Sequence, residues 1–189
     1  MYVTISNFIK EWNKEAILTQ NVLDGLTDAS LQQRVYPEGR NIGRIAWHLT
    51  TSIPEYLAEF GLKIEKIKNA ENVPTSAKEI ADTFMKVSVN AAKVIEEQWN
   101  DESLKQIQNA FGRQETNASI LMGLIKHIVH HRGQNYCSYA SGRIEAIWSL
   151  WTAERRLDSF WGGESTTIKI LYYRIALIQK RLTLFYLYY

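Results

Sequence analysis

The chain has 189 residues and 46% of them are hydrophobic, which is enough for one domain with a sizeable core. Its formal net charge is only +2, and the excess is uneven: residues 1–134 carry 15 Lys and Arg against 16 Asp and Glu, whereas residues 135–189 carry 7 against 4. This distribution argues against a nucleic-acid-binding protein. Cys137 is the only cysteine, which excludes an intramolecular disulfide, and the opening MYVTISNFIKEW does not have the pattern of a secretion signal. We therefore expect a cytoplasmic protein.

Helical periodicity begins near the N-terminus. Apolar residues recur at three- and four-residue steps from Ile5, which predicts an amphipathic helix to about Leu26. The segment YPEGRN is typical of a loop, and a second helix is predicted from near Asn41 to near Gly61. Pro54 lies inside this second helix and is expected to kink or restart it.

Two further helices follow. Ser76 and Glu79 have the spacing of a capping box, and the helical pattern that they precede continues to Trp99. The segment GRQETN interrupts the pattern, and Thr116 or Asn117 can cap a fourth helix. No alternating strand pattern and no internal repeat is present. The sequence thus predicts an all-α fold, a four-helix bundle with long connections allowed between helices 2 and 3 and between helices 3 and 4.

Three of the four histidines lie in the predicted fourth helix, in HIVHHRGQ. His127 and His131 are four residues apart, so they point at one spot, whereas His130 faces elsewhere. His48 lies in the second helix and can supply a third imidazole from across a bundle core. Three histidines leave a coordination position open, as in catalytic metal sites. The alternative is that these histidines are hydrogen-bonded core residues without a metal.

The segments RNIGRIAWHLT and HIVHHRGQ, in this order, resemble the DinB family, damage-inducible four-helix bundles grouped with the YfiT-like metalloenzymes. The resemblance extends over residues 1–134 and includes FIKEW, Arg40 and Gly43. It implies a divalent metal ion, nickel or zinc, held by one histidine of helix 2 and two of helix 4, which in this chain are His48, His127 and His131. It also implies a homodimer, a role in the stress response, and support roles for three neighbours: His130, Arg132 and Gln134.

Two functions are consistent with these residues. In the first, the protein is a metal-dependent enzyme of the thiol-transferase or hydrolase type, in which an activated thiolate or water attacks a small electrophile. The resemblance favours this reading, because some members transfer low-molecular-weight thiols such as bacillithiol or mycothiol. In the second, it is a non-catalytic stress-induced binding protein with a structural or adventitious metal. Trp47 and Cys137 are interpreted as packing residues, and the catalytic residues cannot be assigned from the sequence.

The resemblance stops at Gln134, so residues 1–134 are predicted to be the bundle and residues 135–189 the end of helix 4 with an atypical aromatic, basic tail. Codons read one base later can encode Ile-Thr-Val-His-Met-Arg-Gln-Ala-Gly-Leu-Lys from Asn135 onward, and then the Tyr-Gly and Asp-Trp pairs that family members have. We therefore hypothesise a frameshift near Gln134. Arg174, Gln179, Lys180 and Arg181 interrupt the final apolar stretch, so no membrane span is predicted.

Overall fold

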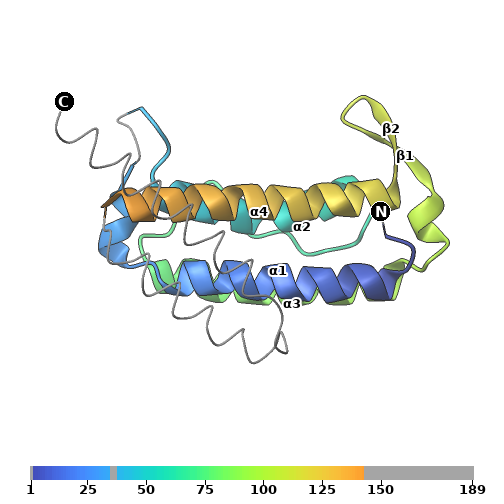
Figure 1. Cartoon of the computed structure of the whole chain (residues 1–189), viewed down its shortest axis with the longest axis horizontal. Coiled ribbons are helices and arrows are strands. Elements are labelled where there is room, and N and C mark those ends of the chain that lie inside the picture. The colour runs from blue at the N-terminus through green and yellow to red at the C-terminus, as the bar shows by residue number, and fades with distance from the viewer. Residues whose placement is uncertain (1, 35–37, 143–189) are drawn as a thin grey trace, which may run out of the picture. The chain divides into compact units, whose positions relative to one another are not determined.

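The computed structural model describes residues 2–34 and 38–142, together with the side chains of these segments up to Ser138. Its helices are α1 (Ile5–Asp24), α2 (Ile42–Glu59), α3 (Ala77–Gln98) and α4 (Asn117–Gly142). Helices α1 and α2 each pack against both α3 and α4, which makes a four-helix bundle (Figure 1). The predicted all-α bundle is confirmed. The features expected of residues 143–189 lie outside the described residues.

Each helix begins at a residue whose side chain accepts a hydrogen bond from the first turn. Thr4 caps α1, Asn41 caps α2 and Ser76 caps α3. The Thr116 hydroxyl accepts a bond from the backbone N–H of Ser119 at 3.2 Å and so caps α4. Such caps satisfy backbone donors that have no partner within the helix. The predicted starts of helices 3 and 4 are therefore confirmed.

Helix α2 does not restart at Pro54 but continues through it to Glu59. A proline inside a helix removes one backbone hydrogen bond and crowds the preceding turn. Here the cost is offset by packing, because Ile53, Pro54 and Leu57 are all buried. Of the two expectations, a kink or a restart, the restart was wrong, because the helix is continuous from Ile42 to Glu59.

The connection between α2 and α3, residues 60–76, runs back along the bundle (Figure 1). The indole N–H of Trp47 in α2 donates a hydrogen bond to the carbonyl oxygen of Ala70 at 2.7 Å. This bond fastens the connection to the helix that carries His48. A long connection was expected at this point, and it lets α2 and α3 run in the same direction.

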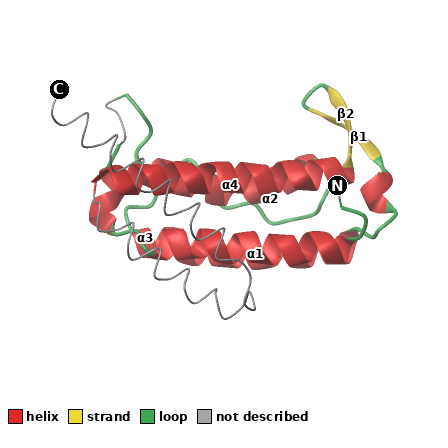
Figure 2. Ribbon diagram, viewed as in Figure 1, coloured by secondary structure: helices red, strands yellow, loops and turns green. Residues whose placement is uncertain are grey.

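The connection between α3 and α4 contains a β-hairpin that the sequence pattern did not predict (Figure 2). Strand β1 (Ile107–Ala110) pairs antiparallel with β2 (Arg113–Thr116). The two turn residues, Phe111 and Gly112, have φ values of 53° and 83°, as the tight turns of hairpins require. The segment expected to be only a break is therefore mostly the second strand.

The core is made of large side chains from all four helices. Phe8, Trp12 and Phe84 are fully buried, and the Trp12 indole N–H donates to the carbonyl oxygen of Ser88 at 3.0 Å, linking α1 to α3. Between α2 and α4, the Tyr56 hydroxyl donates to the carbonyl oxygen of Ile120 at 2.9 Å. A Cβ atom at Gly123 would lie 2.6 Å from that hydroxyl, so a larger residue here would displace the Tyr56 side chain from this hydrogen bond.

None of the helices in the described part of the chain is long and apolar enough to span a membrane.

Candidate metal centre

Three imidazole rings converge between α2 and α4. The ring centroids of His48 and His131 are 4.6 Å apart, those of His127 and His131 4.5 Å, and those of His48 and His127 5.4 Å. One ring nitrogen of each histidine lies within 4.8 Å of one ring nitrogen of each of the other two. His131 is buried and the other two are half-buried. The structure thus brings together the three histidines that the sequence singled out.

The helices explain this convergence. His127 and His131 are one turn apart on α4, so both project from the same face toward α2. His130 is exposed, and its nitrogens are not part of the cluster. The prediction that His130 faces elsewhere is therefore confirmed.

Hydrogen bonds determine which ring nitrogen of His127 and of His131 keeps a free lone pair. His131 Nδ1 lies 2.8 Å from the amide oxygen of Gln134, which can only accept, so Nδ1 carries the proton and Nε2 keeps its lone pair. His127 Nε2 lies 3.0 Å from Ser52 Oγ, whose own proton is donated to the carbonyl oxygen of Leu49. His127 Nε2 therefore donates to Ser52, and the lone pair of His127 is on Nδ1.

The electrostatic environment keeps the three rings neutral. Burial lowers the pKa of His127 to about 4, with further contributions from His131, His48 and His130. Burial also lowers the pKa of His131, opposed by the hydrogen bond that its ring donates to Gln134. Burial lowers the pKa of His48 as well, helped by the charges of Arg40 and Arg44. A metal ion binds only the neutral imidazole, so all three rings are in the binding-competent state at neutral pH.

This donor set fits a divalent ion of the nickel or zinc type. Imidazole nitrogen is a ligand that both ions accept, and ligands of a tetrahedral zinc ion at about 2.0–2.1 Å are about 3.4 Å from each other. The nitrogens of the cluster all lie within 4.8 Å of one another. Within the described residues the cluster holds no fourth histidine, cysteine or carboxylate, so a position remains for an exogenous ligand.

Arg132 supports the site from the other side of α4. Its guanidinium forms an ion pair with the Glu15 carboxylate at 2.7 Å and donates to the Glu15 carbonyl oxygen and the Thr19 hydroxyl. These contacts tie α4 to α1. The support roles that the resemblance implied for Arg132 and Gln134 are consistent with these contacts and with the Gln134–His131 hydrogen bond described above.

Three other residues of α2 and α4 differ in how well the sequence predicted their surroundings. Trp47 is buried in the core, as expected. Cys137 is exposed rather than packed, because it lies on the outer side of α4 between the buried residues Asn135 and Ser138. Ser52 was missed; its position four residues after His48, on the same face of α2, was the available signal.

A four-helix bundle with three inward-facing histidines on two helices defines a class of candidate metalloprotein. A sequence profile of the DinB family matches residues 1–138, and the chain belongs to this family. It is 39% identical over 134 residues to the uncharacterized protein YrdA of Bacillus subtilis (strain 168), covering 71% of this chain and 80% of that protein.

Solved structures agree with this assignment. The crystal structure of a DinB-like protein from Bacillus cereus ATCC 10987 superimposes with a TM-score of 0.71 at 42% identity, covering 75% of this chain and 95% of that one. The DinB-like protein YjoA from Bacillus subtilis has a TM-score of 0.54 at 14% identity, covering 70% and 90%, and supports the fold alone.

Proposed function

We propose that this protein is a metal-dependent enzyme that holds a nickel or zinc ion through His48, His127 and His131. The observation that carries the proposal is the convergence of three neutral imidazoles from two helices with no further protein ligand in the described cluster. When bound, such an ion acts as a Lewis acid and lowers the pKa of a water or thiol that reaches it.

The residues around the cluster contribute orientation and a partly dry environment. Ser52 and Gln134 hydrogen-bond to one nitrogen of His127 and of His131, and so leave the lone pair on the other nitrogen of each ring. The reaction that fits is nucleophilic attack by a thiolate or a water on a small electrophile. In thiol transfer, the sulfur forms a bond to the electrophilic carbon, the leaving group departs with its electron pair, and the thiol proton passes to solvent.

The test is metal-dependent turnover with a matched pair of variants. Purified protein is stripped with a chelator, reloaded with nickel or zinc, and assayed for consumption of a thiol and a chromogenic aryl halide. We expect about one ion per chain and turnover only in the reloaded protein. His131→Ala is expected to lose both properties, and His130→Ala to keep them because His130 is exposed. Equal losses in the two variants would contradict the ligand assignment.

One observation favours a second function, that of a non-catalytic metal-binding protein. No carboxylate forms a hydrogen bond or an ion pair with any of the three histidines within residues 2–34 and 38–138, so no general base is positioned there. Full metal occupancy without turnover of any thiol or ester substrate would favour this alternative.

We also propose a cytoplasmic homodimer that takes a low-molecular-weight thiol and serves in a stress response. Exposed apolar side chains on α1 and α3, namely Ile17, Met85 and Val89, offer a surface that a second copy can cover. Light scattering of the full chain measures the association directly. A monomer at micromolar concentration would contradict the dimer.

A further inference from the structure

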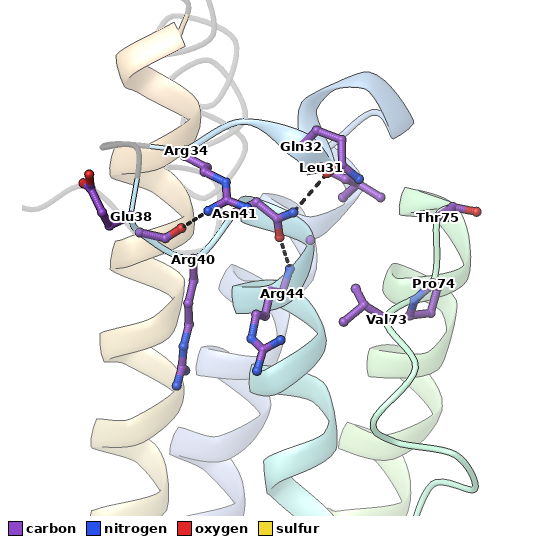
Figure 3. Close-up of a pocket in the computed structure, with 12 residues that line it drawn as sticks. Leu31, Gln32, Arg34, Glu38, Arg40, Asn41, Arg44, Val73, Pro74 and Thr75 are labelled. Carbon is purple, nitrogen blue, oxygen red and sulfur yellow. Dashed lines mark hydrogen bonds between the residues drawn. The ribbon is translucent and has the colours of Figure 1, made fainter.

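A cavity of about 400 Å³ lies beside the amino end of α2, the helix that carries His48 (Figure 3). Three arginines line it, Arg34, Arg40 and Arg44, against a single carboxylate, that of Glu38. Figure 3 shows the Glu38 side chain pointing away from Arg40 and Arg44. The cavity therefore has a strongly positive wall.

Arg40 and Arg44 are not engaged in the ion pairs of the described part of the chain. Those pairs use other cations, Lys78, Lys93, Lys105 and Arg132. Both arginines are exposed, so their donors are open to a ligand.

The backbone that carries these two arginines is held in place. The Asn41 side chain accepts a bond from the backbone N–H of Arg44 at 2.8 Å and donates to the side chain of Gln32 at 3.1 Å. Arg34 donates to the carbonyl oxygen of Gly39 at 2.8 Å. Gly39 and the start of α2 are thereby tied to Arg34 and Gln32, which sets the spacing of Arg40 and Arg44.

Both arginine side chains extend in the direction of the turn of α2 that carries His48 (Figure 3). In Figure 3 the two side chains extend along α2 from its amino end, and His48 lies one turn beyond Arg44. Arg44 and His48 are four residues apart and therefore lie on the same face of α2.

We propose that Arg40 and Arg44 bind an oxyanion, a carboxylate or a phosphate, of the small-molecule substrate and so place its reactive atom at the histidine cluster. A guanidinium is always charged and presents paired donors that match the two oxygens of such a group. The positive wall also attracts anions from solution. The inference deepens the proposed function and rests on it for the role in turnover, but the binding site itself does not depend on catalysis.

The first experiment measures binding without turnover. Isothermal titration calorimetry of the metal-free full chain uses inorganic phosphate and succinate as probes. Arg40→Gln and Arg44→Gln are each expected to weaken the binding of the preferred anion about tenfold, the loss expected for a charged hydrogen bond. Arg113→Gln, an exposed arginine on the hairpin at the other end of the bundle, is the control and is expected to bind like the unaltered chain. Tighter binding of phosphate or of succinate identifies which oxyanion the site prefers.

The second experiment separates this inference from the proposed function. In metal-loaded protein, Arg44→Gln is expected to raise KM for mercaptoacetate about tenfold and to leave KM for mercaptoethanol, which lacks a carboxylate, unchanged. If no variant shows turnover but anion binding still requires the two arginines, the anion site stands and the proposed enzyme is wrong. Anion affinities that are equal in all four proteins, or no anion binding at all, would overturn the anion site even if metal-dependent turnover is found.

Discussion

Replacing Asn135 by isoleucine is expected to stabilise the protein, because Asn135 is a buried amide without a hydrogen-bond partner. The side chain is fully buried on α4, one turn beyond His131. Neither its Oδ1 nor its Nδ2 has a partner among the described residues. Isoleucine is also the residue that the shifted reading frame supplies at this position, so the substitution tests the proposed origin of residues 135–189 as well.

The size of the effect follows from three contributions. Removing an unpaired buried amide gains about 1–3 kcal/mol. The additional apolar burial contributes about 0.8 kcal/mol for each methylene group. A branched side chain in a helix, in a space shaped for asparagine, costs about 1 kcal/mol. We therefore expect Asn135→Ile to raise the free energy of unfolding by about 2 kcal/mol and Tm by about 4–8 °C.

The assay is thermal and urea unfolding of the metal-free protein, followed by circular dichroism, because a bound ion would itself raise Tm. Asn13→Ile, at an exposed position of α1, is the matched control and is expected to change the free energy of unfolding by less than about 0.5 kcal/mol. If Asn135→Ile destabilises the protein, the amide has a partner such as a bound water, and the reasoning is refuted.

Three further predictions concern the histidine cluster and the C-terminal segment. Ser52→Ala is expected to weaken metal binding about 10–100-fold in a chelator competition; tighter binding would mean that Ser52 competes with the ion for His127. Metal-free protein is expected to lose stability as the pH falls from 6.5 toward about 4, because His127 takes up a proton more readily in the unfolded chain than in the folded one. Urea titrations in which His127→Ala and the unaltered chain have the same pH dependence would contradict this. Replacing residues 135–189 by the shifted-frame peptide is expected to raise turnover without changing metal content, since the proposed ligands precede Asn135; equal turnover in both chains, or gene codons that exclude the shifted frame, would argue against the frameshift.

Much of the fold was predictable because helix periodicity and capping are local properties. Ser76 and Thr116 each lie beside the helix that they cap, so the starts of α3 and α4 could be read from short segments. The hairpin was missed because its strands have four residues each and its turn is Phe-Gly rather than the usual Asn-Gly.

The histidine cluster was predictable only in part. The spacing of His127 and His131 places both on one face, but their meeting with His48 depends on how α2 packs against α4, and only the family resemblance indicated it. The roles of Arg40 and Arg44 depend on the path of a loop, and the pairing of Arg132 with Glu15 joins residues more than a hundred positions apart. Neither leaves a periodic signal in the sequence.

The adjacent residues His131 and Arg132 limit where residues can be inserted into α4 or deleted from it. Successive residues on a helix are rotated by about 100°, so His131 faces α2 while Arg132 reaches α1. Together they fix the rotation of α4 about its own axis. Inserting or deleting one residue between Asn117 and His131 would turn both side chains away from their partners at once. A change in length at the exposed hairpin turn, Phe111 and Gly112, would leave the rotation of α4 unaltered and would disturb only the ring contacts of Phe111 with Tyr56 and Phe60.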